Sequence, residues 1–146
     1  TVAELLKLHA TVDEATDVWD AVFAGAALLC CYCRGRWGDL MRSESAFLDT
    51  DENGAPAFLE TRTGRHKTMS SQMHRHQFLP MVAPVKGVHG CDWSSPWIKR
   101  RQELGLTFPP SGLIMPAPDR EGSATQRPLG QRPTEAGQAA AKFCDW

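Results

Sequence analysis

The sequence lacks any long hydrophobic run. A membrane-spanning helix needs about 20 consecutive apolar residues, whereas the longest apolar stretch of this chain covers only residues 21–33. The N-terminus also lacks the basic residues that precede the apolar part of a secretory signal. We therefore expect a protein of the nucleus or cytoplasm with no membrane partner. Because the chain begins with Thr1 and stops at Trp146 inside a helical pattern, we also expect it to be part of a longer protein.

The cysteines are unsuited to a disulfide framework. There are five, an odd number, and Cys30, Cys31 and Cys33 lie in one apolar run. Adjacent cysteines in a helix point to different faces, so this spacing does not favour pairing. The pattern indicates a reducing compartment in which the thiols act as small buried hydrophobes. Tyrosine is rarer still, because Tyr32 is the single example.

The chain has almost no net charge, but its charges are unevenly distributed. The total is −1, yet residues 1–59 carry 4 basic and 10 acidic side chains, which gives −6. Residues 60–101 carry 8 basic and 2 acidic side chains, which gives +6, and hold four of the five histidines. Residues 102–146 carry 4 basic and 5 acidic side chains, which gives −1. The basic segment is either a solvated face or a surface for a polyanion, and both interpretations stay open.

The N-terminal part of the chain predicts two helices. Thr1 with Glu4 and Thr11 with Glu14 have the spacing of capping boxes, in which a hydroxyl and a carboxylate satisfy the first backbone N–H groups of a helix. The first helix is expected to be short. The second is expected from about residue 12 to residue 33, with Gly35 as its C-cap and its apolar second half at the centre of the core.

A small antiparallel sheet is expected next. Residues 46–50, 57–62 and 76–82 have the composition of strands, and residues 51–54 have hairpin turn chemistry. The predicted class is therefore α+β, with N-terminal helices followed by a three-stranded meander.

The C-terminal third predicts a helix and an irregular connection. Residues 97–106 are expected to be helical, with Ser94 or Ser95 as the N-cap. Residues 107–133 hold six of the ten prolines and three glycines, and we expect a linker that runs over the surface. Residues 134–146 are expected to begin a truncated helix.

An arginine with an acidic neighbour follows the long apolar helix. Arg36 is expected at the edge of the core, and Asp39 is spaced to orient its guanidinium through a bidentate pair. A guanidinium that is held in this way suits a phosphate, because its planar fork matches two oxygens and it keeps its charge. The alternative is an ordinary ion pair at a helix end.

A lysine lies in the connection between the second and third predicted strands. Lys67 can reach over a cleft from this turn, and its ammonium can donate a proton to a leaving oxygen. The alternative is a solvated lysine on a loop.

The order of these elements resembles the catalytic domain of the tyrosine recombinases, the phage-integrase-like enzymes that break and rejoin DNA. In that family a long apolar helix leads to a Tyr-x-Gly-x-Arg-like segment followed by an acidic residue and leucine. Residues 32–40 (Tyr-Cys-Arg-Gly-Arg-Trp-Gly-Asp-Leu) are similar, with the glycine displaced by one position. The family also has a lysine before its third strand, which matches Lys67 and residues 78–81 (Phe-Leu-Pro-Met). The resemblance covers residues 1–106 and is closest to recombinases of eukaryotic mobile elements.

The resemblance implies a transesterification of the type IB topoisomerase kind. Arg36 would hold the scissile phosphate, Asp39 would support Arg36, and Lys67 would protonate the leaving 5′ oxygen. No metal or nucleotide cofactor is implied, because a covalent phosphotyrosine stores the bond energy. The partner is DNA, contacted through its phosphate backbone, with assembly of several protomers on DNA in the full-length protein. The further DNA-binding residues are expected to be Arg62, Arg65, His66, Arg75 and His76.

Two parts of the family's site have no counterpart in this chain. The family's second cluster, a His-x-x-Arg followed by a His or Trp, is not matched, because His74, Arg75 and His89 come too early. The nucleophilic tyrosine is expected near the C-terminus, whereas Tyr32 belongs to the first motif and is expected in the core. The chain is therefore interpreted as the first half of an active site, a fragment of a recombinase that is inactive alone or only binds DNA.

A second interpretation is a zinc-stabilised interaction module without an enzymatic role. The pairs Cys31 with Cys33, His74 with His76, and His89 with Cys91 have soft ligand types. None has the spacing of a zinc knuckle, and two cysteines two positions apart in a helix diverge by about 200°.

Overall fold

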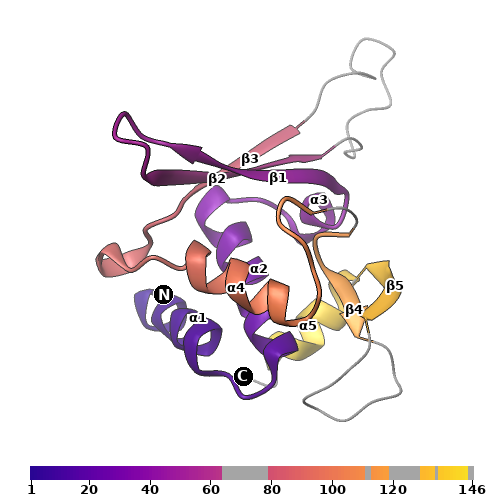
Figure 1. The fold of residues 1–146 in the computed structure, drawn as a ribbon. Coiled ribbons are helices and arrows are strands. Elements are labelled where there is room, and N and C mark those ends of the chain that lie inside the picture. Colours follow the sequence, from indigo (N-terminus) through magenta and orange to yellow (C-terminus); the bar gives the residue numbers. More distant parts are fainter. Residues whose placement is uncertain (64–78, 111–112, 119–128, 134, 145–146) are drawn as a thin grey trace.

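A computed structural model describes residues 1–63, 79–110, 113–118, 129–133 and 135–144. The expected α+β class is confirmed. In chain order the elements are α1 (Val2–Glu14), α2 (Val18–Cys33), α3 (Trp37–Leu40), β1 (Ser43–Thr50), β2 (Pro56–Thr63), β3 (Leu79–Pro84), the 3-10 helix η2 (Val88–Gly90), α4 (Ser94–Glu103), β4 (Pro116–Pro118), β5 (Leu129–Pro133) and α5 (Ala136–Cys144). The helices lie on one face of the three-stranded sheet (Figure 1). Among the described residues, no helix combines the length and apolar character needed to cross a bilayer.

The helix boundaries near the N-terminus differ in part from those expected. The capping box of Thr1 and Glu4 is confirmed. The second box is wrong, because Thr11 lies inside α1 and its hydroxyl donates to the Lys7 carbonyl at 2.9 Å. Helix α2 begins later, where Asp17 Oδ1 accepts the Trp19 N–H at 2.9 Å. The carboxylate of Asp17 thus serves as the N-cap that the sequence pattern assigned to Thr11.

Helix α2 is the centre of the core, as expected from its apolar second half. Its residues 21–29 are all buried. Gly25 lies in the middle of this run, and a Cβ added there would approach the Trp97 Cδ1 atom to 2.0 Å. Trp97 is fully buried on α4, and its indole N–H donates to the Val22 carbonyl at 2.8 Å. The glycine therefore lets α4 pack directly against the backbone of α2.

The end of α2 also differs from the expectation. Arg34, not Gly35, has the left-handed conformation of the C-cap, with φ of 53° and ψ of 30°. The Gly35 N–H donates to the Cys30 carbonyl at 3.0 Å. Gly35 is needed for another reason, because a Cβ there would lie 2.8 Å from both Cys33 Sγ and Met81 Sδ.

The sheet has the order β1-β2-β3 with antiparallel neighbours. Leu59 and Met81 belong to the face that is buried against the helices, whereas Phe58 and Val82 are exposed on the other face. The β1–β2 turn forms as expected, because Asp51 Oδ1 accepts the N–H groups of residues 53 and 55. The third strand was expected from residue 76, and its described part begins at Leu79.

Helix α4 is capped by a residue that the sequence analysis overlooked. Asp92 Oδ1 accepts the N–H groups of Ser94 and Ser95 at 2.9 and 3.2 Å, and both serine hydroxyls also donate to its carboxylate. The predicted serine caps are therefore wrong. Both serines belong to the first turn of α4, which begins earlier than expected.

Part of the proline-rich segment belongs to the core. Ile114 and Met115 are each 1% exposed and join the main hydrophobic cluster. The expectation of a connection that runs over the surface is therefore wrong for residues 114–116, which are buried. Two short strands, β4 and β5, pair antiparallel within this part of the chain. A helix near the C-terminus is present as expected, since α5 covers residues 136–144.

Candidate functional site

Arg36 lies at the surface immediately after the buried helix α2. It is the N-cap residue of α3, with an extended backbone (φ −90°, ψ 145°), and its side chain is exposed. The core lies on both sides of it in the sequence, because residues 21–29 of α2 are all buried and Leu40 of α3 is fully buried. A rigid support under an exposed guanidinium is what a phosphate-binding arginine needs.

Asp39 is tied to Arg36 through the main chain. The Asp39 N–H donates to the Arg36 carbonyl at 2.9 Å, and Ser43 Oγ donates to the Asp39 carbonyl at 3.2 Å. None of the salt bridges between described residues joins the Arg36 guanidinium to the Asp39 carboxylate. The support that Asp39 gives to Arg36 in this structure is therefore the short helical turn of α3 itself.

The two strand ends next to residues 64–78 lie near α3. Thr63, the last residue of β2, pairs with Ser43 on one side and with Leu79 on the other. Ser43 Oγ donates to the Asp39 carbonyl, so Thr63 and Leu79 lie at the end of the sheet next to α3 (Figure 1).

Most of the predicted basic site lies outside the described residues. This holds for Lys67, Arg65, His66, Arg75 and His76. The convergence of Arg36 and Lys67 on one surface consequently stays a prediction.

Arg62 is the one further DNA-binding candidate whose position is described. Strand alternation places Thr61 inside the core and Arg62 on the open face of the sheet. Arg62 Nε pairs with Glu60 Oε1 at 2.9 Å, and its guanidinium lies 4.9 Å from the centre of the Phe47 ring. Glu60 thus offsets part of the positive charge of Arg62.

Arg34 and Arg36 differ in backbone conformation rather than in helical phase. In a continuous helix, residues two positions apart point about 200° apart. Helix α2 ends at Cys33, so this geometry does not apply to Arg34 and Arg36, and both side chains are exposed. Arg42, directly before β1, is a further exposed arginine that the sequence analysis did not single out.

Tyr32 is engaged in the interior, which agrees with its exclusion as a nucleophile. Its hydroxyl lies 2.7 Å from His9 Nε2 and accepts the Val88 N–H at 2.9 Å. Its ring stacks against Trp93 with centres 5.9 Å apart. A phenol held by these contacts is not presented to a phosphate on the surface.

The described residues do not support the zinc alternative. No group of three or more His, Cys, Asp and Glu side chains among them could hold a metal ion. Burial raises the pKa of Cys30 to about 12 and also raises the pKa of Cys31 and Cys33, which disfavours the thiolate form that zinc binds. His74 and His76 lie outside the described residues.

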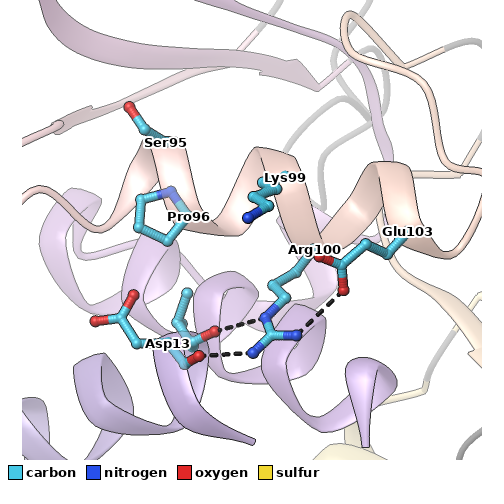
Figure 2. Close-up of a pocket in the computed structure, with 7 residues that line it drawn as sticks. Asp13, Ser95, Pro96, Lys99, Arg100 and Glu103 are labelled. Atoms are coloured by element: carbon cyan, nitrogen blue, oxygen red, sulfur yellow. Dashed lines mark hydrogen bonds and ion pairs between the residues drawn. The ribbon is translucent and has the colours of Figure 1, made fainter.

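A groove of about 460 Å³ lies between α1 and α4 (Figure 2). Arg100 crosses it and donates to the carbonyls of Val12 and Asp13 at 3.2 and 2.6 Å, while Glu103 pairs with the same guanidinium at 3.1 Å. These carbonyls belong to the last turn of α1, where a cation also interacts favourably with the negative end of the helix dipole. Arg100 therefore joins two helices, and all three of its nitrogens donate to residues of the chain itself.

Comparison of the chain with protein families, with characterised proteins and with solved structures gives no match. The functional argument therefore depends on the arrangement of the chain's own residues.

Proposed function

We propose that this chain is the first half of a DNA strand-exchange site of the tyrosine-recombinase kind, and that by itself it binds the DNA backbone without cutting it. The observation that supports this proposal is the position of Arg36. It is exposed just after the buried helix α2, at the end of the sheet where β2 ends at Thr63 and β3 begins at Leu79.

The chemistry of the proposed site follows from two cations of different type. The Arg36 guanidinium donates two parallel hydrogen bonds to non-bridging phosphate oxygens and stabilises the charge that develops there. The Lys67 ammonium donates a proton to the leaving 5′ oxygen. The described residues supply no exposed tyrosine, since Tyr32 is held by His9 and Val88. Cleavage therefore requires a nucleophile from outside this chain.

The basic surface contributes affinity independent of base sequence. Residues 60–101 carry 8 basic and 2 acidic side chains. Because Arg101 is buried and Arg100 is bound to α1, the proposed surface consists of the other basic residues of this range together with the exposed Arg36 and Arg42. Contacts of this kind release counterions from DNA, so the affinity falls with salt.

A salt series on matched variants tests the proposal. The probe is a fluorescein-labelled DNA duplex of mixed sequence, followed by anisotropy in KCl between about 20 and about 200 mM. We expect Arg36→Ala to weaken binding about tenfold at low salt, because one charge-assisted contact is lost. The slope of log K against log salt should also fall by about 0.9, the value of one phosphate contact. Arg34→Ala is the matched control, with the same charge change two residues away and little expected effect.

Replacement of Arg62, Arg65, Lys67 and Arg75 together should flatten the slope further. Absence of binding at low salt in the wild type contradicts the polyanion surface. Equal losses in Arg34→Ala and Arg36→Ala contradict the special role of Arg36. Stoichiometric zinc in the purified chain would favour the interaction module instead.

A further inference from the structure

The Tyr32 hydroxyl lies at the meeting point of three segments that are distant in the sequence. Tyr32 belongs to α2, His9 to α1 and Val88 to η2, which lies in the connection between β3 and α4. The Val88 N–H donates to the phenol oxygen at 2.9 Å, and His9 Nε2 lies 2.7 Å from the same oxygen. With the neutral imidazole protonated on Nδ1, the phenol oxygen accepts from Val88 and the phenol proton is donated to His9 Nε2, so that all three groups are paired.

The connection between β3 and α4 fits closely over this pair. A Cβ added to Gly87 would lie 2.1 Å from the Tyr32 oxygen and 2.7 Å from His9 Nε2, so only glycine fits there. At the other end of the connection, Trp93 stacks on the Tyr32 ring and its indole N–H donates to the Pro84 carbonyl at 2.8 Å. Val85 and Trp93 anchor the two ends of the connection in the core, and between them Tyr32 and His9 contact residues 87 and 88.

The surroundings of His9 favour its neutral form. The side chain is 7% exposed, and this burial lowers the pKa of His9 below the usual value of 6.5, although Asp13 on the same helix acts in the opposite direction. From α4, Arg100 binds the carbonyls of Val12 and Asp13 and adds positive charge at that end of α1. From the connection itself, Lys86 and His89 are exposed, and Gly87 presents only backbone.

Protonation of His9 breaks the hydrogen-bond chain. Nε2 then carries a proton and can no longer accept, so the phenol proton loses its acceptor. The imidazolium is also placed in a site that excludes most of the solvent. At acidic pH both effects destabilise the packing of this connection against His9 and Tyr32.

We propose that His9 and Tyr32 form a pH-sensitive latch, which holds residues 86–91 against α1 and α2 while His9 is neutral and releases them when His9 is protonated. This inference does not depend on DNA binding. It concerns the connection that follows β3, the strand that bounds the C-terminal end of the 64–78 segment.

Residue-resolved amide hydrogen exchange at about pH 7.5 and about pH 5.0 tests the latch. We expect the protection factor of the Val88 amide to fall about tenfold in acid. The amides of residues 21–29 in α2 serve as the reference for global unfolding and should change less. Protection factors correct for the intrinsic pH dependence of exchange, so the comparison reports the opening alone.

Three variants separate the latch from general destabilisation. In His9→Gln the amide oxygen can accept the phenol proton at both pH values, so the protection of Val88 should not depend on pH. Tyr32→Phe should lose that protection at both pH values. His89→Gln removes an exposed histidine of the same connection and should keep the wild-type response.

The proposal is overturned if the wild-type Val88 amide is equally protected at both pH values. It is also overturned if His9→Gln retains the pH response. The wild-type measurement decides the question alone should Tyr32→Phe fail to fold.

Discussion

Replacement of Gly25 by alanine has two opposite effects on the stability of the fold. The tertiary structure decides which of the two is larger. Gly25 lies in the interior of α2, where alanine is intrinsically favoured over glycine by about 1 kcal/mol. From helix propensity alone, Gly25→Ala should therefore stabilise the protein. In the folded chain the new methyl group would lie 2.0 Å from Trp97 Cδ1 and 2.3 Å from Trp97 Cγ.

Trp97 cannot move aside without loss. Its side chain is fully buried, and its indole N–H donates to the Val22 carbonyl at 2.8 Å. Overpacking of a dense core costs about 1–3 kcal/mol, and a lost hydrogen bond adds about 1 kcal/mol. After subtraction of the propensity gain, we expect a net destabilisation of about 2 kcal/mol. For a chain of this size that corresponds to a fall in Tm of about 4–8 °C.

Urea denaturation followed by tryptophan fluorescence, with thermal unfolding by circular dichroism, measures this effect. Gly137→Ala is the matched control, because Gly137 lies in α5 and a Cβ there meets nothing within 4 Å. It should leave stability unchanged or raise it by up to about 1 kcal/mol. If Gly25→Ala is as stable as the wild type, the close contact between α2 and α4 is not as described.

Two further predictions concern α4. Asp92→Ala should cost about 1–2 kcal/mol in urea denaturation, because four donors of Ser94 and Ser95 lose their acceptor. Burial raises the pKa of Asp92, but the hydrogen bonds from Ser95 and Ser94 outweigh it, so the net pKa is lowered from its usual 3.8. The group therefore stabilises the fold above about pH 4 and loses this contribution as the pH falls, and the acid limb of the stability profile should be flatter in Asp92→Ala. Arg101 is 1% exposed, burial lowers its pKa to about 10, and it donates to the Ile114 carbonyl. Arg101→Ala should lower the free energy of unfolding by about 3 kcal/mol, because it leaves a cavity and removes the donor to the Ile114 carbonyl. Arg101→Met fills the space without a buried charge and should lower it clearly less. Equal losses in the two variants would contradict this explanation.

Local signals in the sequence were sufficient for several elements. The capping box of Thr1 and Glu4, the turn at residues 51–54 and the apolar pattern of α2 all formed as expected. Each depends on interactions between residues a few positions apart, so the surrounding fold has little influence on them. The exposure of Arg36 in the candidate site could be predicted for the same reason, since an arginine soon after an apolar helix is expected at the surface.

Competition between similar local signals could not be resolved from the sequence. Thr11 and Asp17 are both residue types that favour the N-cap position. In the structure Thr11 lies inside α1, and Asp17 caps α2. Ser94, Ser95 and Asp92 presented the same choice at α4, where the serines became part of the first turn. A cap is determined by where the helix starts, and tertiary packing sets that position.

What the sequence by itself determined is the α+β class, the central helix and the exposure of Arg36. The tertiary structure alone decided which distant groups meet: Ile114 entering the core, Trp97 against Gly25, and Tyr32 between His9 and Val88. Helix and strand patterns report which side of an element is apolar, and this is a property of nearby residues. The contact between Tyr32 and Val88 joins residues that are 56 positions apart in the sequence. Such contacts depend on how whole elements pack, and no local sequence pattern carries that information.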